Sequence, residues 1–125
     1  METRFIALKE LFQTLHGPQG CQWDKEQTHQ SILAHLREEV DEFIEAVEKG
    51  DSAHMREELG DLLLHVMFHA QIAEKEGAFT IEEVIETLID KLKRRHPHVF
   101  GNLKLQTTRQ IIANWEKIKE QERAS

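Results

Sequence analysis

Apolar residues recur every three or four positions along most of this chain, which is the spacing of one face of an α-helix. This spacing predicts a first helix over about residues 2–15 and a second over about residues 28–49, with a loop between them. Gly17 and Gly50 follow the two segments, and glycine commonly terminates helices. The stripe of the second helix consists of Ile32, Leu33, Leu36, Val40, Phe43, Ile44 and Val47.

A third helix is predicted over about residues 52–75. Its leucines, valine, methionine and phenylalanine lie on nearly every side, a pattern typical of a helix enclosed by neighbours. Four ionisable residues fall on one side of it: Glu58, Asp61, His65 and His69.

Thr80 and Glu83 form a capping-box pattern that predicts a fourth helix over about residues 81–95, ended by Pro97. After a connection, a last helix is expected to reach about residue 122. No alternating strand pattern competes with these helices. The expectation is therefore an all-α bundle of four or five helices that forms a single domain over residues 1–125.

The chain has 125 residues and a net charge of −7, and this acidic balance argues against a direct nucleic-acid binder. Cys21 is the single cysteine, which suits a reducing compartment. No run approaches the roughly 20 apolar residues of a membrane span. We expect a soluble cytoplasmic protein that does not contact membranes.

Two acidic pairs interrupt the apolar helices. Glu39 and Glu42 are three residues apart, as are Glu58 and Asp61, so each pair shares a helical face. An antiparallel arrangement of the two helices brings the four carboxylates together. Protonation, basic neighbours or a bound cation would relieve their repulsion, and oxygen ligands favour Mg²⁺ or Mn²⁺. The open alternative is a solvated acidic face.

A di-iron site using His65 or His69 is a weaker alternative. Di-iron bundles repeat Glu-x-x-His, whereas Glu58 and His65 are seven residues apart. For both histidines, a hydrogen-bonded position near a core is the simpler interpretation.

Lys91, Arg94 and Arg95 share one face of the fourth helix and are suited to bind a polyphosphate. Their alternative role is to complement the helix dipole. Trp23 and Trp115 are also ambiguous, since a tryptophan can stack on a nucleobase or pack in a core, and the helical register of Trp115 with Ile111, Ile112 and Ile118 favours packing.

Five segments together resemble, in order and spacing, the MazG family of nucleoside triphosphate pyrophosphohydrolases, from about residue 17 to 123. They are GCQWDKEQTH, EEVDE, EELGDLLLHVMFHAQ, KRRHPHVFG and NWEKIKEQE.

The resemblance implies an all-α fold that forms a homodimer or larger assembly. It also implies Mg²⁺-dependent hydrolysis of the α–β bond of a nucleoside triphosphate, giving monophosphate and pyrophosphate, in the clearance of unwanted nucleotides. By resemblance Glu38 orients or deprotonates the attacking water, although helical spacing directs it away from Glu39. The metal ligands implied are Glu39, Glu42, Glu58 and Asp61, and the substrate-binding residues implied are Lys91, Arg94, Arg95, Trp115 and Lys119.

The chain departs from the family pattern at Gln22, where proline is usual, and at His54, where some relatives carry lysine. It looks most like the first module of tandem MazG proteins. Two alternatives follow: a catalytically weak or silent helical dimerisation module, and an enzyme narrowed to one nucleotide. Nothing in the sequence selects a base or a sugar.

Overall fold

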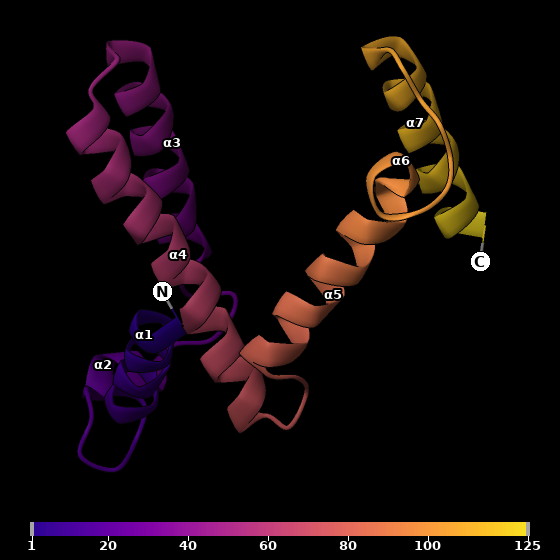
Figure 1. Cartoon of the computed structure of the whole chain (residues 1–125). Helices are drawn as coiled ribbons and strands as arrows, with labels where there is room; N and C mark the ends of the chain where they lie inside the picture. The colour runs from indigo at the N-terminus through magenta and orange to yellow at the C-terminus, as the bar shows by residue number, and fades with distance from the viewer. Residues whose placement is uncertain (1, 125) are drawn as a thin grey trace. The chain divides into compact units, whose positions relative to one another are not determined.

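The computed structural model describes residues 2–124, and every regular element within them is an α-helix, as predicted. The helices are α1 (Glu2–Leu15), α2 (Gln22–Glu26), α3 (Leu33–Lys49), α4 (Ser52–Lys75), α5 (Ile81–Arg95), α6 (Pro97–Phe100) and α7 (Thr108–Ala124) (Figure 1). No helix among these residues is long and apolar enough to cross a bilayer. The chain forms two compact units that divide after Ile81, and the assignment of the whole chain to one domain stays a prediction.

In the first unit α3 and α4 form an antiparallel hairpin, with α1 packed against α4 (Figure 1). Gly50 ends α3 in the left-handed conformation at a φ of 67°, which glycine adopts without a Cβ clash. The Asp51 carboxylate then accepts a hydrogen bond from the His54 amide and caps α4. This two-residue turn fixes the register of the hairpin.

The second helix was predicted to begin at residue 28, but α3 begins at Leu33. Residues 28–31 form a turn in which Thr28 and Ser31 each bond the other's backbone amide through a hydroxyl oxygen. Such side-chain bonds compete with helical ones at a helix start. Two short helices, α2 and α6, also occupy stretches predicted to be irregular.

The core of the first unit lies where α1 and the C-terminal half of α4 meet. Phe12 packs edge-on against Phe68 with ring centroids 6.3 Å apart, and His16 packs on the same ring at 4.8 Å. The buried apolar side chains are Phe12, Ile32, Ala46, Met67, Phe68, Ala70, Ile72, Ala73 and Ile81.

The prediction that neighbours enclose the third helix is wrong for the chain alone. Leu59 is 53% exposed, and other apolar side chains of α4 and most of the α3 stripe are also exposed. The reason is that α4 turns its ionisable side toward α3, so most of the apolar residues of its N-terminal half are exposed, whereas Met67, Phe68 and Ile72 are buried. We call this surface the outer apolar face; it comprises Val40, Ile44, Val47, Leu59, Leu63, Leu64 and Val66.

A pair of histidines joins the turn before α3 to α4. The Nδ1 atoms of His29 and His69 lie 2.8 Å apart, and the rings are parallel within 2° with centroids at 5.1 Å. The distance between the ring centroids equals the distance between the Nδ1 atoms plus one ring radius on each side. The two rings therefore lie edge to edge in nearly the same plane. One Nδ1 must therefore donate a proton to the other. Glu76 lies 3.6 Å from His29 Nε2, which favours His69 as the donor.

Replacing either histidine by alanine should lower the free energy of unfolding by roughly 1–3 kcal/mol, because the remaining partly buried ring loses its hydrogen-bond partner. A double-mutant cycle in urea at pH 7.5 should show coupling between the two positions, with the exposed His35→Ala as control. Burial lowers the pKa of His69, as do the nearby His29 and His65. The unfolded chain thus binds protons first, and stability should fall as the pH drops below about 6.5. A coupling energy of zero would mean that the hydrogen bond between His29 and His69 does not hold the turn before α3 against α4.

Candidate metal centre

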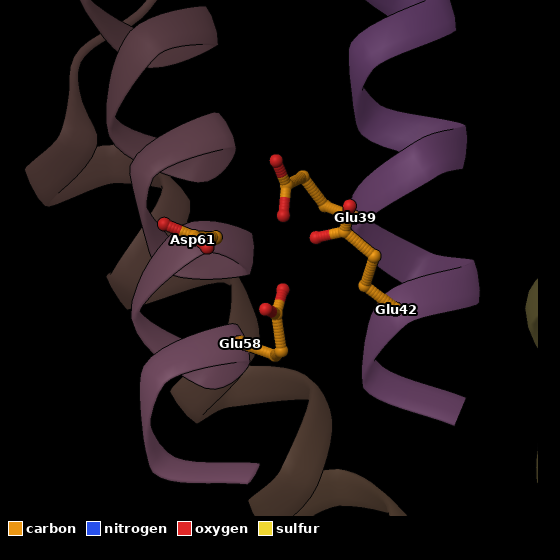
Figure 2. Close-up of side chains that lie close together, drawn as sticks. All are labelled: Glu39, Glu42, Glu58 and Asp61. Atoms are coloured by element: carbon orange, nitrogen blue, oxygen red, sulfur yellow. The ribbon is translucent and has the colours of Figure 1, made fainter. Parts of the chain in front are cut away.

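Four carboxylates from α3 and α4 converge in the hairpin of the first unit (Figure 2). Glu39 and Glu42 come from α3, Glu58 and Asp61 from α4, and one oxygen of each lies within 4.8 Å of the others. This confirms the predicted geometry. Within residues 2–124 it is the single group of three or more acidic, histidine or cysteine side chains close enough to share a cation.

Burial makes this cluster electrostatically costly. The Glu58 side chain is buried, Glu39 and Asp61 are half-buried, and Glu42 is exposed. Glu39 Oε2 and Glu58 Oε2 are shielded from solvent and have no hydrogen-bond partner among the described residues. Such an orphaned oxygen normally finds a partner, either a protein donor, a water molecule or an ion.

The proton affinities reflect this environment. Burial, a hydrogen bond with Glu58 and the charges of Asp61, Glu42 and Glu58 raise the pKa of Glu39 to about 7. Burial also raises the pKa of Glu58, with further contributions from Glu42 and Asp61. A proton on Glu39 therefore relieves the repulsion near neutral pH.

His54 lies one helical turn before Glu58, and its Nε2 atom is 3.3 Å from Glu58 Oε1. In the sequence this residue appeared only as a departure from the family pattern. The i, i+4 spacing was the signal that it borders the cluster, because residues four apart on a helix are neighbours.

Glu38 is not brought into the cluster. Its side chain is 70% exposed and lies 4.0 Å from His35 Nδ1, on the side of α3 that helical spacing predicts. The catalytic role of Glu38 stays a prediction.

His65 and His69 continue the ionisable side of α4 beyond Asp61 but are not among the clustered ligands. His69 bonds His29, as expected for a structural histidine. Burial lowers the pKa of His65, whose Nδ1 is buried without a partner among the described residues. The geometry gives no support to the di-iron alternative.

The predicted substrate-binding residues lie in the second unit. The Arg95 guanidinium carbon is 5.4 Å from the centre of the Trp115 ring, and the His96 ring meets that ring edge-on at 5.1 Å. Arg94 and Arg95 both bond Glu122, a residue that the sequence did not single out. Lys91 and Lys119 are half-buried.

A family model described as the MazG nucleotide pyrophosphohydrolase domain matches residues 27–100. This stretch is more than half of the chain and contains all four carboxylates. The chain belongs to the MazG family.

Relatives of known sequence extend the MazG match over most of the chain. The chain is 51% identical over 119 residues to the nucleoside triphosphate pyrophosphohydrolase/pyrophosphatase MazG of Thermotoga maritima, covering 95% of this chain and 45% of the relative. It is 43% identical to the nucleoside triphosphate pyrophosphohydrolase of Escherichia coli, covering 94% and 45%. It is 50% identical to the uncharacterized protein YabN of Bacillus subtilis, covering 95% and 24%. The chain thus spans less than half the length of these relatives.

The fold has a counterpart among solved structures. The crystal structure of a mazG-related protein from Thermotoga maritima matches with a TM-score of 0.73 at 26% identity, covering 94% of this chain and 98% of that chain.

The MazG carboxylates fit a hard divalent cation. All donors are oxygens, and two of the buried oxygens lack a hydrogen-bond partner among the described residues.

Replacing Glu39 by glutamine should stabilise the metal-free protein at pH 8 relative to the natural chain, by roughly 1–2 kcal/mol. The reason is that folded Glu39 keeps its proton up to about pH 7, whereas an unfolded glutamate loses it near 4.5. The folded state thus binds more protons in this window, and the free energy of unfolding contributed by Glu39 falls as the pH rises.

The measurement is thermal unfolding in EDTA at pH 5 and pH 8, with Asp41→Asn on the exposed side of α3 as control. If Glu39→Gln and Asp41→Asn respond alike, Glu39 is not the strained carboxylate.

Proposed function

We propose that this chain hydrolyses the α–β bond of nucleoside triphosphates to monophosphate and pyrophosphate with Mg²⁺ as its cation. The observation that carries the proposal is the cluster of four carboxylates inside the stretch that matches the family model. The relatives named as nucleoside triphosphate pyrophosphohydrolases support the same reaction. We further propose that it acts in the cytoplasm.

Glu39, Glu42, Glu58 and Asp61 hold Mg²⁺ in this proposal, with Mn²⁺ as a substitute. The bound cation supplies electrophilic activation of a phosphoryl group. Glu39 gives up its proton when the cation binds, so affinity for the cation rises with pH through about 7.

The remaining residues of the proposal position substrate and water. Glu38 orients or deprotonates the attacking water. Arg94, Arg95 and Lys91 offset the negative charge of the phosphates, and Trp115 and Lys119 contact the nucleotide. An acidic protein would otherwise repel its anionic substrate.

The outer apolar face supports a homodimer. Its seven side chains are all at least 40% exposed in the single chain, and exposed apolar side chains in such number on two neighbouring helices support an association site. A second copy covering it would enclose α4 on the sides that α1 and α3 leave open.

Glu39→Gln and Asp61→Asn should each lower turnover by at least roughly 100-fold, because each removes a ligand charge from the cluster. The assay resolves monophosphate, diphosphate, pyrophosphate and phosphate after incubation with each nucleotide, with Mg²⁺ or EDTA. Circular dichroism checks that both variants stay helical, and Asp41→Asn is the control.

Full activity of either variant would remove the cluster from the mechanism. Diphosphate plus phosphate would mean that a different bond is cleaved. Stabilisation by Mg²⁺ without turnover would favour the silent helical module.

Leu59→Glu should convert the proposed dimer to monomer, because a charge at a buried apolar contact must be desolvated. Light scattering after size exclusion measures the mass. Gln19→Glu, which adds the same charge in the loop before α2, should leave the mass unchanged. A natural chain that is already monomeric would contradict the dimer.

A further inference from the structure

Two arginines at the end of α5 converge on one carboxylate of α7. Arg94 Nε donates to Glu122 Oε2 at 2.6 Å, and Arg95 Nη2 donates to Glu122 Oε1 at 2.7 Å. The Arg95 side chain is 17% exposed and that of Glu122 is 23% exposed. All three residues belong to the second unit, so their contact does not depend on the rest of the chain.

Glu122 accepts only some of the hydrogen bonds that the two arginines can donate. Each guanidinium gives the carboxylate a single donor, although a guanidinium can present two parallel donors to one anion. Arg95 Nε is buried and has no partner among the described residues. A phosphate group offers more acceptor oxygens than a carboxylate, so it matches two adjacent guanidiniums better.

The arginine pair and Glu122 together carry a net charge of +1, and two lysines and Asp90 lie one helical turn from them along α5 and α7. Lys91 lies one turn before Arg95 on α5, and Lys119 lies one turn before Glu122 on α7. Trp115 packs on the Arg95 guanidinium and holds it in place. Beside the pair is an open hollow of about 420 Å³ that Arg94 and Glu122 help to line.

We propose that Glu122 is a resident carboxylate in a phosphate-binding site formed by Arg94 and Arg95, and that a phosphate group of the substrate displaces it. This inference rests on the proposed function, which assigns the phosphates to these arginines. Glu122 then holds the guanidiniums together while the site is free and competes with every anion that enters.

The Glu122 carboxylate competes with a phosphate for the arginines through its negative charge, and a change in its protonation plays no part. The bonds from Arg95 and Arg94 lower the pKa of Glu122 to about 2, so the carboxylate stays ionised at any working pH. A group carrying several negative charges displaces it more readily than a group carrying one. Glu122 therefore favours the binding of polyphosphates and speeds the release of anions that carry fewer charges.

The test is calorimetric binding of inorganic pyrophosphate in EDTA, where the carboxylate cluster of the first unit holds no cation. Glu122→Gln should bind pyrophosphate roughly five- to tenfold more tightly than the natural chain, because the ionic competitor is gone. Arg95→Gln should abolish binding in both backgrounds. Glu120→Gln removes the same charge at an exposed position of α7. It should change the affinity less than twofold at 0.15 M salt, where the Debye screening length is about 8 Å and exposed charges are largely screened.

Glu122→Asp provides a second variant if loss of the carboxylate loosens α7, as judged by circular dichroism. The shorter aspartate side chain reaches both arginines less well than glutamate does. The Glu122→Asp variant should therefore also bind pyrophosphate more tightly than the natural chain. Unchanged or weaker binding by both variants would overturn the proposal and leave Glu122 as a tie between α5 and α7. An equal gain in Glu120→Gln would overturn it as well.

Nucleotide hydrolysis with Mg²⁺ is measured separately on the same proteins. A natural chain that fails to hydrolyse nucleotides while Glu122→Gln gains pyrophosphate affinity would refute the proposed function and support the displacement of Glu122. The two measurements therefore distinguish failure of the proposed function from failure of the displacement of Glu122.

Discussion

The first unit depends on one constraint: α4 places its ionisable residues, not its leucines, against α3. Glu58 and Asp61 lie on that side and meet Glu39 from the facing helix, and His54 borders Glu58. Burying like charges opposes folding, because each carboxylate loses solvent and repels its neighbours. A proton or a cation in the seam between the helices relieves this repulsion. The same orientation sends Leu59 and its apolar neighbours outward, so the metal centre and the exposed apolar face have one cause.

Contacts at both ends of the hairpin hold this seam closed. The Gly50 turn and the Asp51 cap join the helices at one end, where the backbone conformation is set by glycine. Beyond the seam, the His29–His69 bond holds the turn before α3 against α4. None of these contacts uses a lysine or arginine side chain. They can position the carboxylates without the strong counter-charges that would also neutralise them, which keeps the cluster available to a cation.

The sequence predicted the helices and the carboxylate cluster because both follow from short-range spacing. Residues three apart must share a helical face, and the two-residue turn at Gly50 must return the chain antiparallel. Periodicity does not say what covers an apolar stripe, which is why the enclosure of α4 was predicted wrongly. The start of α3 was missed because hydroxyl bonds in the preceding turn replace helical ones. Glu122 was missed because its partners are 27 and 28 residues away, beyond any helical spacing.

In both charged centres, a proton or a side chain of the protein offsets the charge that a ligand is proposed to offset. In the first unit a proton on Glu39 stands where a cation is proposed, and in the second unit the Glu122 carboxylate stands where a phosphate is proposed. We infer that each substitute is weaker than the ligand. The proton leaves Glu39 near pH 7, and the Glu122 carboxylate leaves Arg95 Nε without a partner among the described residues. A site filled in this way keeps its side chains in place before the ligand arrives, so less ordering remains to be done on binding. It also limits affinity, because every ligand must first remove the substitute. If the proposed reaction, which releases pyrophosphate, is the activity of this chain, this limit favours turnover over tight binding.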